Sequence, residues 1–222
     1  MINYLRNLLT RNTEYQGQET EDINVIWIHG ANQTSLSFQY LRQQTKFEKE
    51  IFVNYSSMNK FCDNLDMITE EVQGRGPHFV IGHSLGGLYA LHLTQYIRVL
   101  GGVSISTPFA GSSTADWAKY IVPNYPLFRD IGRKADPVRQ AQEIKLDVPW
   151  TQIVSMTGQV PYHGGPNDGV VTIESMKSRT DMEHIEVPHT HYETMCSDLV
   201  ADLIIQKYND CYIKYQQNNK AN

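Results

Sequence analysis

The sequence predicts a single α/β domain built on a mostly parallel β-sheet with helices on both faces. Short apolar runs typical of buried strands alternate with stretches of helical periodicity, as expected when crossover helices connect the strands. Most of these runs are nearly continuous in apolar residues, which is typical of parallel strands covered on both faces. The 222 residues contain no internal repeat and no change of composition that would mark a second domain.

The strands are expected where apolar runs are closed by glycine, proline or polar residues. The run at 183–187 alternates between apolar and polar residues, so we place this strand at an edge of the sheet. The expected strands cover residues 23–28, 51–55, 79–82, 99–106, 150–156 and 183–187.

The helices are expected where apolar residues recur every three or four positions. The helix at 59–73 is the clearest, because Gly74 and the Gly76-Pro77 pair stop it. Residues 1–22 are expected to form a short helix or arm, and the polar tail from residue 216 is expected to fray. The other expected helices cover residues 35–46, 85–96 and 192–208.

Residues 109–149 differ in character from the rest of the chain. They contain Pro123, Pro126 and Pro137 and several aromatic residues, and we interpret them as an insertion of short helices that forms a small cap. Packing within a modest insertion explains the aromatic residues equally well. These aromatic residues are Trp117, Tyr120, Tyr125 and Phe128.

Composition and charge exclude several classes of protein. Hydrophobic residues make up 41% of the chain and charged residues 19%, which is typical of a folded protein. The formal net charge of −5 and the absence of a lysine and arginine cluster argue against nucleic acid as a partner. Cys62, Cys196 and Cys211 are too few and too scattered for a disulfide framework or a zinc site, and they favour a reducing compartment.

The N-terminal region indicates the cellular location. Arg6 and Arg11 interrupt its apolar residues, so no signal-peptide core is visible, and no stretch approaches the length of a membrane span. We therefore expect a cytoplasmic protein without a transmembrane segment. Secretion by a route that needs no signal peptide would leave the same sequence.

A G-x-S-x-G sequence, Gly82-His83-Ser84-Leu85-Gly86, joins the strand expected at 79–82 to the helix that follows. In such a turn, strained backbone geometry lifts the serine hydroxyl clear of the sheet, and the flanking positions approach too closely for a side chain. The N–H of Leu85 would then point at the oxygen of a substrate held against Ser84. The alternative interpretation is a glycine-rich turn whose serine caps the helix.

A nucleophilic serine needs a histidine base and a carboxylate that orients it, which follow the serine along the chain in proteins with this turn. Asp168 is our candidate acid, because it lies among glycines and a proline in the loop after the strand at 150–156. An ordinary Asx turn is the alternative there. Asp147 precedes that strand and so falls at the wrong edge of the sheet, which leaves Asp181 as the serious competitor.

Two histidines follow the last expected strand. We prefer His191 as the base because it stands at the mouth of the final helix, and His189 is second. A metal site at this pair lacks a third ligand with matching spacing. His163 is expected to line the cleft, and His83 to pack beneath the turn.

The oxyanion hole needs two hydrogen-bond donors. Leu85 N–H is one, and the loop after the first strand, His29-Gly30-Ala31, supplies the other through Ala31 N–H. Both stretches follow parallel strands, so we expect them to meet at the carboxyl edge of the sheet, which is where ligands bind in such sheets. We also expect His29, Gly30 and Phe109 to contact the substrate.

The chain resembles α/β-hydrolases of the lipase/esterase branch, and it is similar to small bacterial triacylglycerol lipases and GPI inositol-deacylase-like proteins. The resemblance spans residues 23 to about 205. It rests on residues 28–30, 82–87, 106–112, 167–171 and 190–193.

The resemblance implies a serine hydrolase that cleaves carboxylic esters and needs no cofactor. Ser84 is then the nucleophile, Asp168 the acid and His191 the base, with Ala31 and Leu85 as oxyanion donors. The resemblance implies a small-molecule or lipid ester as substrate, and it makes transient contact with a lipid interface possible. It specifies no metal site. A thioesterase or amidase with the same triad, or a catalytically silent binding protein with this fold, are the alternatives.

Overall fold

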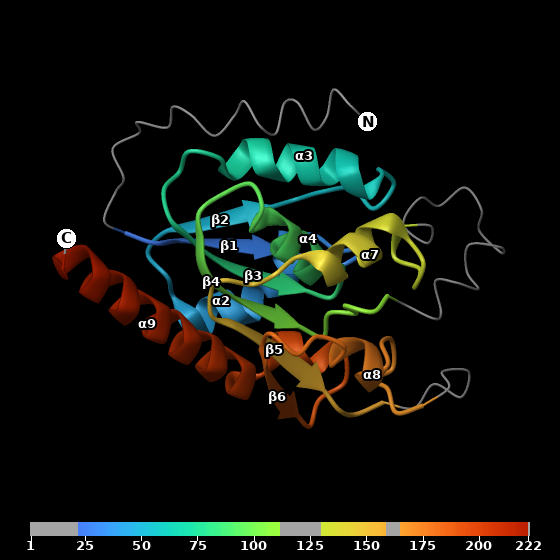
Figure 1. The fold of residues 1–222 in the computed structure, drawn as a ribbon. Helices are drawn as coiled ribbons and strands as arrows, with labels where there is room; N and C mark the ends of the chain where they lie inside the picture. Colours follow the sequence, from blue (N-terminus) through green and yellow to red (C-terminus); the bar gives the residue numbers. More distant parts are fainter. Residues whose placement is uncertain (1–21, 112–129, 159–164, 222) are drawn as a thin grey trace.

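A computed structural model describes residues 22–111, 130–158 and 165–221 of the chain (Figure 1). Six strands form one sheet in the order β2-β1-β3-β4-β5-β6, and all neighbouring strands are parallel. The prediction of a mostly parallel sheet is thus confirmed. The strands are β1 (Asn24–Ile28), β2 (Glu50–Val53), β3 (His78–His83), β4 (Val99–Ile105), β5 (Trp150–Ser155) and β6 (Glu183–Val187).

Helices connect the strands and cover both faces of the sheet (Figure 1). The α-helices are α2 (Gln39–Thr45), α3 (Phe61–Val72), α4 (Leu85–Leu93), α7 (Asp136–Glu143), α8 (Ile173–Met176) and α9 (Asp198–Ala221). Two 3₁₀ helices, η1 (Ser35–Phe38) and η2 (Glu193–Cys196), precede α2 and α9.

The pleat of β1 divides the core into two layers. Ile26 and Ile28 belong to the core cluster that includes residues of α3, α4 and α7, whereas Val25 and Trp27 belong to the cluster that includes residues of α2 and α9. Successive side chains of a strand point to opposite faces, so a fully buried strand must be apolar at every position. The near-continuous apolar run of β1 has this cause.

The final helix begins later and ends later than the sequence predicts. It starts at Asp198 rather than near Tyr192, because η2 and Ser197 precede it, and the Ser197 hydroxyl accepts a hydrogen bond from Val200 N–H (3.3 Å). It continues to Ala221, so the expected fraying from residue 216 is absent up to that residue. Cys211 and Tyr215 anchor this second half in the core.

The carboxyl ends of five strands are aligned, which creates one edge for a site. Ile28 pairs with Gly82, His83 pairs with Ile105, and Ser155 pairs with Val187. The chain leaves β1 toward β2 on one side and returns to β3 on the other. This change of direction marks the place where open parallel sheets bind ligands.

Several predictions concern residues outside the described ranges. These are the N-terminal arm before residue 22, the four aromatic residues of the expected cap and His163. Within the described part of the insertion, α7 buries Val138 and Ala141 against the core.

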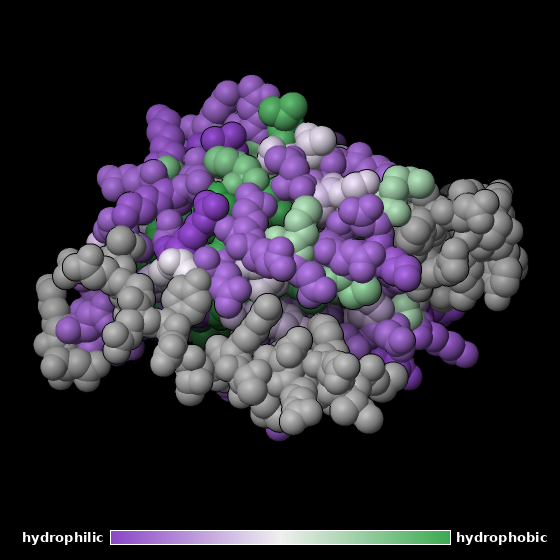
Figure 2. Space-filling model, turned by 90° about the horizontal axis from the view of Figure 1, so that it is seen from above, coloured by the Kyte–Doolittle hydropathy of each residue, from purple (hydrophilic) through white to green (hydrophobic). Residues whose placement is uncertain are grey.

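No helix of the described residues is long and apolar enough to cross a lipid bilayer. On the face seen in Figure 2, hydrophilic residues predominate among the described atoms, and hydrophobic residues form small areas between them.

Candidate active site

Ser84 sits at the sharp turn between β3 and α4. Its backbone has φ +53° and ψ −121°, a conformation that L-residues rarely adopt. The turn is anchored on the neighbouring strand, because Ser84 N–H donates to the carbonyl oxygen of Ile105 (2.8 Å). Strand, strained serine and helix follow one another as the G-x-S-x-G sequence predicts.

The glycines around Ser84 are required by close contacts with backbone atoms. A Cβ added at Gly82 would lie 2.5 Å from the carbonyl oxygen of Gly86. A Cβ at Gly86 would overlap the carbonyl oxygen of Ile28, at the end of β1. The second glycine is therefore needed mainly because α4 presses on β1, rather than only because the two glycines face each other.

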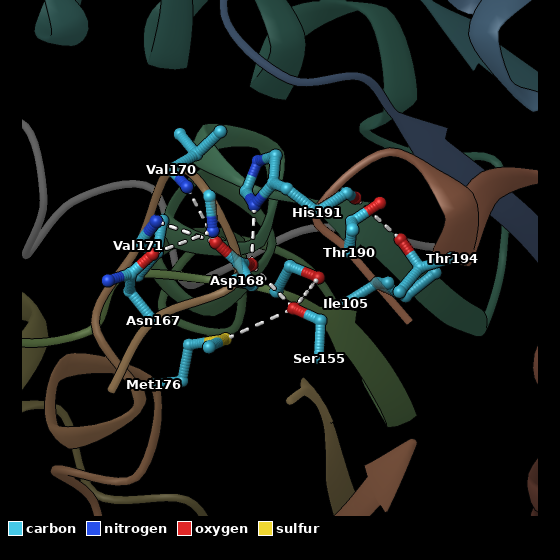
Figure 3. A network of polar contacts seen from close by, with 12 residues as sticks. Ile105, Ser155, Asn167, Asp168, Val170, Val171, Met176, Thr190, His191 and Thr194 are labelled. Atoms are coloured by element: carbon cyan, nitrogen blue, oxygen red, sulfur yellow. Dashed lines mark hydrogen bonds and ion pairs between the residues drawn. The ribbon is translucent and has the colours of Figure 1, made fainter. Parts of the chain in front are cut away.

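Asp168 is a buried carboxylate held by four hydrogen bonds. Its Oδ1 accepts from Val170 N–H (2.9 Å) and Val171 N–H (2.7 Å), which is an Asx-type turn, while its Oδ2 accepts from His191 Nδ1 (2.7 Å) and the Ser155 hydroxyl (2.5 Å). Figure 3 shows these contacts converging on the carboxylate. Burial opposes the charge of Asp168, but the bonds from His191, Ser155 and Val171 outweigh it and lower the pKa of the carboxyl below its ordinary value.

His191, rather than His189, is the histidine that contacts Asp168. Its ring is buried, and its backbone N–H also donates to the carbonyl oxygen of Asp168 (2.9 Å). A carboxylate only accepts hydrogen bonds, so Nδ1 of His191 carries the hydrogen of this bond, and Nε2 is the ring nitrogen that does not face Asp168. His189 instead contacts the Ser197 hydroxyl through Nε2 (2.7 Å) at the start of α9.

His83 connects the serine turn to the loop of His191. Its ring is completely buried, as predicted, and it lies 4.8 Å from the His191 ring. Burial, with a smaller effect of His191, lowers the pKa of His83 to about 3, so its ring is neutral and has one N–H. We place that hydrogen on Nε2, which donates to the carbonyl oxygen of His191 (3.1 Å). The longer contact of Nδ1 with Gln33 Oε1 (3.3 Å) is then not a hydrogen bond.

The Ser84 hydroxyl makes no hydrogen bond with His191 among the described residues. The two loops lie next to each other, because His83, which precedes Ser84 in the chain, binds the His191 backbone. Catalytic hydrogen bonds of this kind are often long without substrate and shorten when it binds.

The loop after β1 lies directly beside Ser84. A Cβ added at Gly30 would be 3.2 Å from the Ser84 Cβ. His29 Nδ1 donates to the carbonyl oxygen of Gly30 (2.7 Å), and its Nε2 accepts from Tyr55 N–H (3.2 Å). In a trans peptide the C=O and the next N–H point in opposite directions, so this contact turns Ala31 N–H away from His29.

The two expected oxyanion donors are unoccupied by other described residues. Neither Ala31 N–H nor Leu85 N–H donates to one of them, although most buried backbone donors in proteins are paired. Leu85 is also the first residue of α4, where the helix dipole favours negative charge. Both groups are therefore available to an anionic oxygen.

Two expected substrate contacts have a different place. The side chains of His29 and Phe109 are completely buried. The His29 ring stacks on Tyr55, and the Phe109 ring belongs to the apolar core. In this structure both side chains pack beneath the loops around the site.

The competing acids lie elsewhere. Asp181 binds the guanidinium of Arg179 through both carboxylate oxygens, and Asp147 is exposed before β5. Within the described residues, no group of three or more His, Cys, Asp or Glu side chains is placed to hold a metal ion. Ser155, which binds Asp168, escaped the sequence analysis. Its position at the end of the strand before the Asp168 loop is the one signal that points to it.

A hollow of about 440 Å³ lies at the opposite, amino edge of the sheet. Gly102, Trp150 and Glu183 line it together with Cys211. Burial raises the pKa of the Cys211 thiol to about 11, so this group is protonated near neutral pH and unsuited to act as a nucleophile.

Comparison with known proteins reveals relatives in structure only. No protein-family model and no curated sequence matches the chain. A lipase-esterase related protein from Clostridium acetobutylicum is 14% identical, with a TM-score of 0.60 over 86% of this chain and 96% of its own. The mature lipase BlEst2 from Bacillus licheniformis is 14% identical, with a TM-score of 0.67 over 87% and 94% of the two chains.

Phospholipase PlaB from Legionella pneumophila is 15% identical, with a TM-score of 0.66, and the match covers 89% of this chain and 61% of PlaB. The chain has an α/β-hydrolase fold. In an α/β-hydrolase, the turn after a central strand, the acid loop and the histidine loop follow one another along the chain. In this chain, the turn at Ser84, the loop of Asp168 and the loop of His191 follow one another in that order.

Proposed function

We propose that the protein is a serine hydrolase that cleaves carboxylic esters through an acyl-enzyme. One observation carries the proposal: a buried Asp168–His191 pair, joined at 2.7 Å, lies at the same sheet edge as a serine in strained geometry. A carboxylate that holds a histidine tautomer beside a serine turn is the arrangement that activates a hydroxyl. A serine that only caps a helix needs none of these partners.

In this mechanism, Nε2 of His191 removes the proton of Ser84 as its oxygen attacks the ester carbonyl carbon. The oxyanion that forms accepts hydrogen bonds from Ala31 N–H and Leu85 N–H. His191 returns the proton to the departing alcohol, which leaves an acyl-serine. A water molecule then repeats the cycle with His191 as base, and the carboxylic acid is released.

The surroundings of the site favour an apolar substrate. Leu36, Met58 and Tyr192 are 72%, 59% and 60% exposed, and they stand in segments that follow β1, β2 and β6 at the carboxyl edge. The Tyr192 ring also packs against the ring of His191 at 5.1 Å. Apolar side chains next to such a site suit an acyl chain or contact with a lipid surface.

The test is a series of p-nitrophenyl esters of increasing chain length, with matched thioesters and anilides, with and without detergent micelles. We expect hydrolysis of the esters by the wild-type protein and none above background by Ser84→Ala. Thioesters cleaved faster than esters would redirect the assignment to a thioesterase. No turnover of any acyl donor under all these conditions would contradict the proposal and favour the binding-protein alternative.

A further inference from the structure

We propose that Ser155 and Ser106 form a hydroxyl relay that positions the carboxylate of Asp168 for His191. Both serines act through Asp168 and touch no substrate atom, so they are positioning residues. The inference rests on the proposed function and adds two residues to its machinery.

The relay is a continuous chain of short polar contacts. The Ser106 and Ser155 hydroxyls are 2.8 Å apart, and the Ser155 hydroxyl is 2.5 Å from Asp168 Oδ2. That same oxygen accepts from His191 Nδ1 (Figure 3). Both serines are completely buried, at 0% exposure, so water does not compete for these contacts.

Counting hydrogens fixes the direction of the relay. Each hydroxyl has one hydrogen, and the Asp168 carboxylate can only accept. Ser155 also lies 3.6 Å from the sulfur of Met176, but a charged oxygen is a much stronger acceptor than a thioether. The hydrogen of Ser155 therefore goes to Asp168, and Ser106 must donate to Ser155.

The relay ties the acid to the sheet. Oδ1 of Asp168 is held by Val170 and Val171, which belong to the same loop as the acid itself. Ser155 is the last residue of β5, and Ser106 directly follows β4. Among the described residues, Ser155 thus supplies the one side-chain hydrogen bond from the sheet to the carboxylate.

The backbone of Ser106 supports a specific role. Its φ is +53°, which costs a non-glycine residue of this kind free energy, and its N–H donates to the carbonyl oxygen of Ile153 (2.9 Å). This held geometry places its hydroxyl on Ser155. At the Asp168 end of the relay, the neighbouring imidazoles are His191, which binds the carboxylate, and the neutral His83, which lies against His191.

The experiment compares Ser155→Ala, Asp168→Asn and the double variant in full-length protein. We measure kcat and KM for a reactive ester and the rate at which a fluorophosphonate labels Ser84. We expect Ser155→Ala to lower kcat about tenfold at unchanged KM, because a hydrogen bond to a charged group is lost. In the Asp168→Asn background, the same change should cost less than about twofold, since both act through one carboxylate.

Ser104→Ala is the matched control. Ser104 is a buried serine on β4 whose hydroxyl binds Trp150 Nε1 (3.1 Å) and not the site, and we expect kcat within about twofold of wild type. Ser155→Thr keeps the hydroxyl and should restore most of the activity. If Ser155→Ala does not fold, Ser106→Ala leaves Ser155 in place and should show a smaller loss of kcat with the same non-additivity. Activity of Ser155→Ala equal to wild type, or an equal loss in both backgrounds, would overturn the relay.

A spectroscopic readout separates failure of the relay from failure of the proposed function. The proton between His191 Nδ1 and Asp168 should give a low-field ¹H resonance whether or not Ser84 reacts. Loss of the competing donor in Ser155→Ala should move it to lower field, and Ser104→Ala should leave it unchanged. A protein that hydrolyses nothing but shows this shift keeps the relay and loses the proposed function. An unmoved resonance overturns the relay alone.

Discussion

Ser84 and Ser106 directly follow the neighbouring parallel strands β3 and β4, and both have a φ of +53°. The two are linked, because Ser84 N–H donates to the carbonyl oxygen of Ile105, the residue before Ser106. One strained serine presents the candidate nucleophile, and the other begins the contacts that lead to the candidate acid. The strain at both positions, roughly 1–3 kcal/mol each, is tolerated because the preceding strand and a backbone hydrogen bond to the next strand hold each serine in place.

Asp168 should make the stability of the protein depend on acid pH. Its pKa is lowered in the folded state, so the folded form binds fewer protons than the unfolded form near the ordinary aspartate value of 3.8. The stabilisation is present above that value and is lost as the pH falls through the folded-state pKa. Urea unfolding between about pH 6 and about pH 3 should show a steeper fall for wild type than for Asp168→Asn. Parallel curves for the two proteins would contradict the described environment of Asp168.

The two histidines of the 189–191 segment should differ sharply in their effect on catalysis. His191→Ala removes the partner of Asp168 and should lower kcat by on the order of 10³-fold or more. His189→Ala removes only the contact with Ser197 near α9 and should lower stability slightly while kcat stays within about threefold. Ester hydrolysis at saturating substrate measures both. A larger loss of kcat in His189→Ala would reverse the assignment of the base.

His29 should matter for the oxyanion loop although it is buried. His29→Phe keeps the ring beside Tyr55 but removes the hydrogen bond to the Gly30 carbonyl oxygen that orients Ala31 N–H. We expect kcat to fall by about 10- to 100-fold with little change in KM, since an oxyanion donor acts mainly in the transition state.

The control for His29 is His92→Phe. His92 is another buried histidine, on α4, whose Nε2 contacts the carbonyl oxygen of Pro137 (2.9 Å) away from the site. It should lose stability without losing kcat. Equal effects of the two variants on kcat would argue against a role for the His29 contact.

Gly86→Ala should damage the fold and the site together. The added methyl group would overlap the carbonyl oxygen of Ile28, which belongs to the sheet and cannot move freely. Gly101→Ala is the comparison, because a Cβ added at Gly101 would lie 3.1 Å from its nearest neighbour, the carbonyl oxygen of Pro149. Thermal unfolding should show a loss of about 2 kcal/mol or more for Gly86→Ala and a clearly smaller one for Gly101→Ala. The reverse order would contradict the packing of α4 on β1.

The sequence predicts the elements whose signals are local. The alternating strand predicted at 183–187 has the same bounds as β6, and the sharp turn at Ser84 follows from the five residues of the G-x-S-x-G sequence. The predicted start of the final helix was wrong. Tyr192 and Met195 continue the apolar spacing of α9, but their backbone belongs to a turn and a 3₁₀ helix. A 3₁₀ helix places residues three apart on one side, which imitates helical periodicity.

The candidate site also has a part that the sequence predicts and a part that it does not. The chain order places Ser84, Asp168 and His191 at one edge of the sheet, and their loops meet there. Side-chain direction is not contained in that order, so the sequence could not indicate that the side chains of His29 and Phe109 are fully buried. The position of Ser155 at the end of a strand is only a weak signal, because polar residues are common there and its partner Asp168 lies in a loop thirteen residues away.

The central claim is that Ser84 is a nucleophile activated by His191 and Asp168, and covalent labelling tests it most directly. Wild type, Ser84→Ala and His191→Ala are incubated with a fluorophosphonate, with and without detergent, and their intact masses are measured. We predict one adduct on the wild type, none on Ser84→Ala and much slower labelling of His191→Ala. A wild-type protein that stays unlabelled in both conditions, or a Ser84→Ala variant that labels equally fast, would contradict the account.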